Sequence, residues 1–139
     1  MGLRKLKKER TPIYSHLAPD PIGPYSQAVA YGDMIFTSGQ IALDMDGKRV
    51  GGDDIKIQTR IALENLLHIL EDNNSSMDHV VKTTVYLTNM DDFAEMNEVY
   101  NSFFGGSKPA RSTVQVSRLP KDVKVEIDAI AYMVKKKRY

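Results

Sequence analysis

Four stretches of the chain alternate apolar and polar residues, a pattern that predicts β-strands because successive strand residues point to opposite faces of a sheet. The expected strands are a hairpin over 27–38 with its turn at Gly32-Asp33, and single strands over 80–88, 111–116 and 123–134. In the strand over 80–88, one face would carry Val81, Thr83, Val85 and Leu87. In the last strand, one face would carry Val125, Ile127, Ala129, Ala131 and Met133, and the other Lys124, Glu126, Asp128, Ile130 and Tyr132.

Two further stretches repeat apolar residues every three or four positions and are predicted to be amphipathic helices. The first runs from about residue 53 to 72 and begins with two aspartates, whose carboxylates can accept hydrogen bonds from the free amides of a first helical turn. The second begins near Asp91 or Asp92 and ends at Gly105-Gly106. Four prolines within the first 24 residues favour extended backbone there.

Strands and helices in the order β-β-α-β-α-β-β predict an α+β fold with both helices on one face of a mostly antiparallel sheet. Ile130 and Tyr132 are apolar residues on the otherwise polar side of the last strand, which suggests that another subunit covers the second face of the sheet. We therefore expect one domain over residues 17–134 that forms a homo-oligomer, a flexible basic arm over 1–16 and a basic tail over 135–139.

The composition is that of an ordinary globular domain, and it excludes several kinds of site. The chain has 139 residues and no cysteine, so we expect no disulfide, no thiolate metal ligand and no cysteine nucleophile. Its three histidines are too few and too scattered for a histidine zinc cluster. The sequence holds no phosphate-binding glycine loop, and no apolar run approaches the roughly 20 residues of a membrane span.

The net charge of +1 combines basic ends with an acidic body. Residues 1–10 and 135–138 hold nine of the 19 basic residues and one of the 18 acidic residues, so residues 11–134 carry a net charge of −7. We expect no membrane and no nucleic-acid partner for such a body, although the basic ends leave weak contact with RNA open. The lysine-rich start fits a secretory signal or a mitochondrial presequence poorly, so we expect a cytoplasmic protein, with a mitochondrial location as the alternative.

Arg111 and Glu126 are the most informative pair of charged residues. Each alone is typical of a surface charge or of half a salt bridge. An arginine can also bind a small carboxylate with two parallel hydrogen bonds, and a neighbouring carboxylate can orient or deprotonate a water molecule. The two residues lie in strands joined by the 117–122 connection, which we expect to pair, and Ser38-Gly39 ends a hairpin strand that could complete a small-acid site.

Six segments resemble the RidA family, also called the YjgF/YER057c/UK114 family. They are Gly23–Ala28 (GPYSQA), Phe36–Ile41 (FTSGQI), Val81–Leu87 (VKTTVYL), Asp92–Tyr100 (DFAEMNEVY), Pro109–Val116 (PARSTVQV) and Leu119–Ala131 (LPKDVKVEIDAIA). They occur in the family's order and with compatible spacing, so the resemblance covers the chain from about residue 17 to 134 and leaves the basic ends outside.

The resemblance implies a chorismate-mutase-like α+β fold assembled as a homotrimer, with active sites in the clefts between subunits. It also implies the activity of a 2-iminobutanoate/2-iminopropanoate deaminase. Such an enzyme hydrolyses reactive 2-imino acids and their enamine tautomers, released by pyridoxal-phosphate enzymes, to 2-keto acids and ammonia. A protonated imine is already electrophilic and mainly needs to be positioned, so we expect a small 2-imino or 2-keto acid as ligand and no metal or organic cofactor.

The resemblance assigns roles to individual residues. Arg111 matches the arginine that binds the substrate carboxylate, and Glu126 matches the acid that positions the attacking water. The residues that match the rest of the pocket are Tyr25, Ser38 and Asn97, with the backbone of Gly39 and Thr113. Family members with high imine hydrolase activity often have a cysteine at the position of Thr113. This chain departs from the family pattern at that position, and the departure bears on its substrate range.

Two other functions stay open. Some relatives have been described as translation inhibitors or ribonucleases, and the basic ends agree with such an RNA-directed activity. The acidic body and the lack of a histidine pair oppose it, because acid–base cleavage of RNA uses groups that titrate near neutrality. The second alternative is a trimer that binds small carboxylates without converting them.

Overall fold

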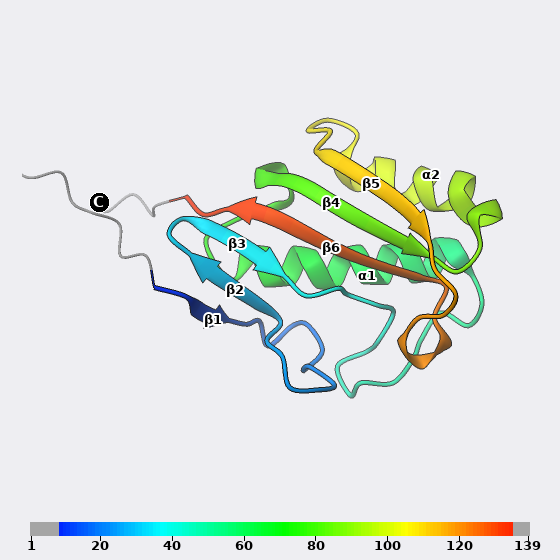
Figure 1. Cartoon of the computed structure of the whole chain (residues 1–139), viewed down its shortest axis with the longest axis horizontal. Helices are drawn as coiled ribbons and strands as arrows, with labels where there is room; N and C mark the ends of the chain where they lie inside the picture. Colours follow the sequence, from blue (N-terminus) through cyan, green and yellow to red (C-terminus); the bar gives the residue numbers. More distant parts are fainter. Residues whose placement is uncertain (1–8, 135–139) are drawn as a thin grey trace, which may run out of the picture.

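The computed structural model describes residues 9–134 as a six-stranded sheet with two helices packed on one of its faces (Figure 1). The strands are β1 (Thr11–Ile13), β2 (Ala28–Tyr31), β3 (Met34–Thr37), β4 (Val80–Leu87), β5 (Ala110–Gln115) and β6 (Val125–Tyr132), and the helices are α1 (Ile55–Glu71) and α2 (Phe93–Phe104). The α+β class is confirmed, and so is the expected order of elements from β2 to β6, to which the structure adds the strand β1. The first half of the basic arm and the whole basic tail fall outside the described residues.

The strands lie in the order β1-β2-β3-β6-β4-β5, so the last strand of the chain is central in the sheet. All neighbours are antiparallel except β4 and β5, which are parallel. The expected direct pairing of the Arg111 and Glu126 strands is therefore wrong, because β4 lies between β5 and β6. The reason is that α2 forms a crossover connection after β4, and such a connection returns the chain parallel to the strand it left.

The first strand lies within the segment that the sequence assigns to a flexible arm. Thr11–Ile13 pairs antiparallel with β2, so the sheet begins well before residue 17. Pro12 removes one backbone donor, which restricts such a strand to the edge of a sheet. The neighbouring hairpin is confirmed, since Gly32 has φ +61°, as a two-residue turn of the expected Gly-X kind requires.

The core lies between the helices and one face of the sheet. Asp54 caps α1 by accepting hydrogen bonds from the amides of Lys56 and Ile57 at 2.9 and 3.2 Å. The buried stripe of α1 includes Ala62, Leu63, Leu66, Ile69 and Leu70. The strand residues that face it in β6 are Val125, Ile127, Ala129 and Ala131, as the alternation predicts.

One residue of β4 faces the other way from its predicted orientation. Val81 is 43% exposed, whereas Val80 is buried with Thr83, Val85 and Leu87. The pairing of β4 with β6 shifts register between Val80 and Lys82, which marks a β-bulge. A bulge inserts one residue and reverses the side-chain alternation before it, so a strict period of two assigns Val81 to the wrong face.

The face of the sheet away from the helices is open and partly apolar. Its exposed large residues are Tyr31, Phe36, Val114 and Tyr132, and both helices lie behind the sheet in Figure 1. An apolar patch of this kind commonly marks an association surface. In the described part of the chain, neither helix is long and apolar enough to cross a membrane.

Candidate active site

Glu126 is the second residue of β6 and points to the open face of the sheet. Its neighbours Val125 and Ile127 are fully buried on the helix side, so the strand alternation places Glu126 on the other side, where it is half-buried. The backbone of Gly39 approaches it closely: a Cβ atom at residue 39 would lie only 2.6 Å from the Glu126 carboxyl carbon. Only glycine therefore fits at position 39 without strain.

Two elements hold the segment after Gly39 in place. The amide of Gln40 donates to the carbonyl of Ile127 at 2.8 Å, and the amide of Ile127 donates back to Gln40 at 3.0 Å. On the other side, the buried Asn65 of α1 donates from Nδ2 to the carbonyl of Ile41 at 3.1 Å. The segment is thus bound to β6 and to a helix, which fixes the distance between Gly39 and the carboxylate.

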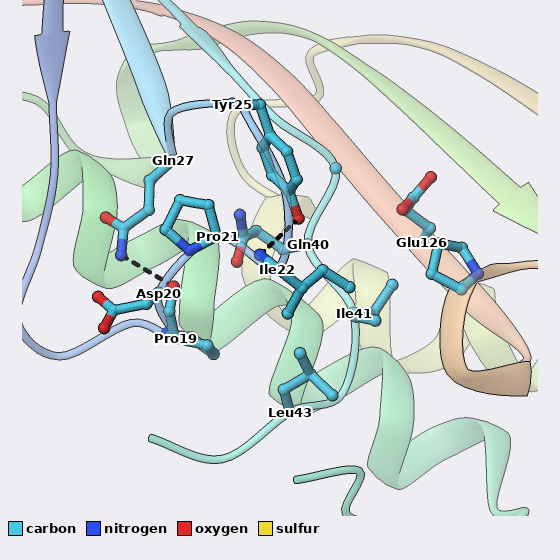
Figure 2. Close-up of a pocket in the computed structure, with 12 residues that line it drawn as sticks. Pro19, Asp20, Pro21, Ile22, Tyr25, Gln27, Gln40, Ile41, Leu43 and Glu126 are labelled. Carbon is cyan, nitrogen blue, oxygen red and sulfur yellow. Dashed lines mark hydrogen bonds between the residues drawn. The ribbon is translucent and has the colours of Figure 1, made fainter. Parts of the chain in front are cut away.

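A pocket opens beside Glu126 between this segment and the loop before β2 (Figure 2). The loop is organised by the buried Gln27, whose Nε2 donates to the carbonyls of Ser15 and Pro19 at 3.1 and 2.9 Å. The Tyr25 hydroxyl accepts a hydrogen bond from the amide of Ile22 at 3.2 Å, as Figure 2 shows. The lining consists of Pro19, Asp20, Pro21, Ile22, Tyr25, Gln27, Gly39, Gln40, Ile41, Leu43, Pro120 and Glu126.

The environment of Glu126 favours its protonated form. Burial is the main cause, and the negative charge of Asp128 on the same face of β6 adds to it, so the pKa of Glu126 lies above its ordinary value. Asp128 in turn accepts a hydrogen bond from the Tyr86 hydroxyl at 3.2 Å. A carboxylate with a raised pKa is a better proton acceptor than an exposed one, as a general base requires.

Arg111 lies on β5, and its side chain packs against α2. Its Nη1 donates to Oδ1 of Asn97 at 2.7 Å, and its Cζ lies 4.6 and 5.5 Å from the ring centroids of Tyr100 and Phe93. No carboxylate within residues 9–134 lies at ion-pair distance from it. The guanidinium therefore keeps its positive charge available to an anion, in a hollow of about 360 Å³.

The remaining predicted residues lie near either Glu126 or Arg111. The Ser38 hydroxyl donates to the carbonyl of Ser26 at 2.6 Å, which ties the residue before Gly39 to the loop before β2. Thr113 lies on the same face of β5 as Arg111, and its buried Oγ1 has no hydrogen-bond partner among the described residues. This hydroxyl is therefore an unpartnered polar group two residues along the strand from Arg111.

The predicted residues form two half-sites on opposite faces of one chain. Arg111 is level with Thr83 of β4, which is buried beneath α2, whereas Glu126 is level with Tyr86, on the other face of β4. The first half-site comprises Arg111, Asn97 and Thr113, and the second comprises Glu126, Gly39, Ser38 and Tyr25. A single chain therefore does not bring its own cation and its own carboxylate to one ligand.

Several residues that shape the half-sites are missing from the sequence prediction. Gln27 and Gln40 stand inside the quoted segments, but nothing in their local pattern distinguishes a buried bracing amide from an exposed one. Pro120 and Leu43 line the pocket because of long-range packing. Tyr100 is recognisable in the sequence only as part of the apolar stripe of the second helix, and its contact with Arg111 needs the tertiary fold.

Comparisons with known proteins identify the family of this chain. A family model described as Endoribonuclease L-PSP matches residues 15–133. A RutC family protein of Pyrococcus abyssi is 54% identical over 120 residues, which are 86% of this chain and 94% of that protein. The Escherichia coli protein named "Putative reactive intermediate deaminase TdcF" is 46% identical over 122 residues, again 86% of this chain and 94% of the relative.

Solved structures with the same fold cover nearly the whole of both chains. The crystal structure of Escherichia coli TdcF with bound serine has a TM-score of 0.82 and 44% identity, over 89% of this chain and 99% of that one. The crystal structure of yeast Mmf1 has a TM-score of 0.87 and 40% identity, over 91% and 100%. The chain therefore belongs to the YjgF/RidA family, whose model carries the description Endoribonuclease L-PSP.

Proposed function

We propose that this protein hydrolyses reactive 2-imino acids, such as 2-iminopropanoate and 2-iminobutanoate, to 2-keto acids and ammonia. The observation that carries the proposal is that the two half-sites offer complementary groups, a cation in one and a carboxylate in the other. One half-site presents an arginine that has no counter-ion among residues 9–134, and the other presents a half-buried carboxylate of raised pKa beside a pocket. A family relative named as a deaminase and its structure with a bound amino acid support the same assignment.

The proposed site forms between two copies of the chain in a homotrimer. The two half-sites lie on opposite faces, so the Arg111 side of one subunit would meet the Glu126 side of the next. Such a head-to-tail contact is heterologous and closes into a ring when the rotation permits. The exposed apolar residues of the open sheet face, among them Phe36 and Tyr132, supply a surface for this contact.

In the proposed reaction, Arg111 binds the substrate carboxylate through two parallel N–H bonds and Glu126 orients a water molecule. The water oxygen attacks the imine carbon of the protonated imine, and its proton passes to Glu126. Glu126 returns this proton to the nitrogen of the tetrahedral intermediate, ammonia leaves, and loss of the hydroxyl proton gives the 2-keto acid. The backbone at Gly39 and Thr113, and the side chains of the other half-site residues, would hold the ligand between the two groups.

The test is a coupled assay with freshly generated 2-iminobutanoate, in which ammonia release is followed for the wild type and for Arg111→Ala. We expect the variant to lose nearly all activity, because the charged anchor for the substrate is removed. Arg111→Lys should also be poor, since an ammonium group does not reproduce the planar fork of a guanidinium. Wild-type rates in Arg111→Ala would overturn the proposed site.

The description of the family model keeps an RNA-directed function as the second candidate. It is separated by deleting residues 1–10 and 135–139, which carry the basic ends. Imine hydrolysis should survive the deletion, whereas RNA binding driven by the ends should vanish. A protein that binds 2-oxobutanoate but never accelerates ammonia release would instead be a non-catalytic carboxylate-binding protein.

A further inference from the structure

Two of the three side chains that contact Arg111, Phe93 and Tyr100, are not among the residues assigned to the substrate. Phe93, Asn97 and Tyr100 stand on one face of α2 at positions i, i+4 and i+7, and all three contact the guanidinium group of Arg111. All three are uncharged groups. They therefore hold the cation without neutralising it, which is what an anion receptor needs.

Tyr100 is the best fixed of the three. It is 7% exposed, its hydroxyl shares a hydrogen bond of 2.7 Å with Oγ1 of Thr83, and its ring packs on Phe104 with centroids 4.7 Å apart. Phe93, by contrast, is 37% exposed. Burial raises the pKa of Tyr100, so its hydroxyl stays protonated at neutral pH and its ring stays uncharged beside the arginine.

The contacts also determine which edge of the guanidinium is free. Asn97 accepts from Nη1, and the Tyr100 ring lies against the guanidinium carbon. Within the described chain, the edge formed by Nε and Nη2 makes no side-chain hydrogen bond of its own. That edge has the two parallel N–H groups that a planar carboxylate accepts, and a ring stacked on the guanidinium does not block it.

We infer that Tyr100 is a positioning residue, which holds the Arg111 guanidinium by its ring face so that the Nε–Nη2 edge is presented to the carboxylate of the ligand. This inference rests on the proposed function, because it assigns Arg111 to a carboxylate. Without the ring, the long arginine side chain samples several rotamers, and binding a ligand then costs the entropy of ordering it. The loss appears in affinity and much less in the rate of the bound complex.

The experiment compares Tyr100→Leu, which removes the ring, with Tyr100→Phe, which keeps the ring and removes the hydroxyl. Calorimetry with 2-oxobutanoate gives Kd, and the 2-iminobutanoate assay gives kcat and KM. Tyr100→Leu should weaken Kd and raise KM by roughly three- to tenfold, with kcat changed less than about twofold. Tyr100→Phe should restore most of the affinity while lowering Tm, because Thr83 loses its partner.

Val99→Ala is the control for damage to α2, since Val99 is buried on the same helix and is not among the side chains that hydrogen-bond or stack on Arg111. It should lower Tm and leave Kd within about twofold. If Tyr100→Leu does not fold, Tyr100→Met keeps more of the volume without an aromatic face and carries the same prediction.

The outcomes separate this inference from the proposed function. Wild-type protein that binds 2-oxobutanoate without hydrolysing the imine overturns the function, and the role of Tyr100 is then decided by Kd alone. Equal Kd values for the wild type and Tyr100→Leu overturn the role of Tyr100 even if the enzyme is active. A Tyr100→Phe variant as weak as Tyr100→Leu would also overturn it, because the hydroxyl and not the ring would be the important group.

Discussion

At the scale of single residues, the carboxylate of Glu126 is kept in an environment that disfavours its charge. It is half-buried, it lies near Asp128, and its pKa is raised by burial first and by that like charge second. The backbone of Gly39 passes so close that a methyl group in place of a hydrogen would collide with the carboxylate. A stable fold does not need this arrangement, whereas a base that accepts a proton from water benefits from it.

The pH dependence of the reaction should report this environment. Only ionised Glu126 accepts a proton, so we expect kcat/KM to fall as pH is lowered through a pKa above the ordinary value of a glutamate. Asp128→Asn removes the second cause of the raised pKa, and the acid limb of the pH–rate profile should then move to lower pH. A limb that stays in place would show that the carboxylate being titrated is not Glu126.

Glu126→Gln should separate stability from activity. The folded chain holds the Glu126 proton more tightly than the unfolded chain does, so this group's contribution to stability is full below the unfolded pKa and is lost as pH rises through the folded pKa. The variant should thus lose less unfolding free energy than the wild type between mildly acidic and neutral pH. Its turnover should fall by about 10²-fold with substrate binding preserved, and an unchanged turnover would contradict the role of Glu126.

Gly39→Ala tests the close approach at the carboxylate. The added Cβ would lie 2.6 Å from the Glu126 carboxyl carbon, so either the side chain or the segment after Gly39 must shift. We expect a loss of activity of more than about tenfold, since a displacement of about 1 Å is costly in catalysis. Gly106→Ala, at a glycine whose added Cβ would meet nothing within 4 Å, is the matched control and should remain active.

At the scale of elements, the second half-site is held together by buried amides that link loops to helix and sheet. Gln27 organises the loop before β2, and Asn65 of α1 holds the segment after Gly39. These loops carry the pocket, whereas the first half-site is built on a strand and a helix. The two halves therefore differ in what secures them, and only one depends on loop conformation.

Asn65→Leu is expected to loosen the pocket through this link. The substitution removes the side-chain donor to the carbonyl of Ile41, which keeps only the amide of Leu43 as a partner, and should lower the unfolding free energy by about 0.5–1.5 kcal/mol. Because the 39–43 segment would lose its side-chain attachment to α1, kcat/KM should fall although Asn65 lies outside the proposed site. Chemical denaturation and steady-state kinetics measure the two effects, and full activity in a destabilised variant would contradict the link.

At the scale of the whole molecule, the decisive fact is that one chain separates its cation from its carboxylate. The strand alternation directs Arg111 and Glu126 to opposite faces of the same sheet, so a single chain would not complete the proposed site from its own residues. Assembly would then be a condition for activity and more than a source of stability. This supports oligomerisation more directly than the exposed apolar residues do.

Mixing two inactive variants provides the corresponding test. Arg111→Ala chains retain a normal Glu126 side, and Glu126→Gln chains retain a normal Arg111 side, so a site between one of each can be intact. Co-refolding equal amounts into trimers should restore about a quarter of the wild-type activity, since each half of a site is intact with a probability of about one half. Activity no higher than that of the separate variants would mean that no site combines Arg111 of one subunit with Glu126 of another.

The sequence by itself determined the two helices, the main strands, the helix-facing residues of β6 and the family, because hydrophobic period, capping and turn chemistry are local properties and the family segments are specific. It did not determine the strand order, the edge strand β1 or the orientation of Val81, which depend on a crossover and a bulge. Only the tertiary structure decided that the side chain of Arg111 packs against α2 while Glu126 faces the open side of the sheet. The direction of a side chain relative to another element follows from the pairing of strands that are distant in the sequence, and no single segment determines that pairing.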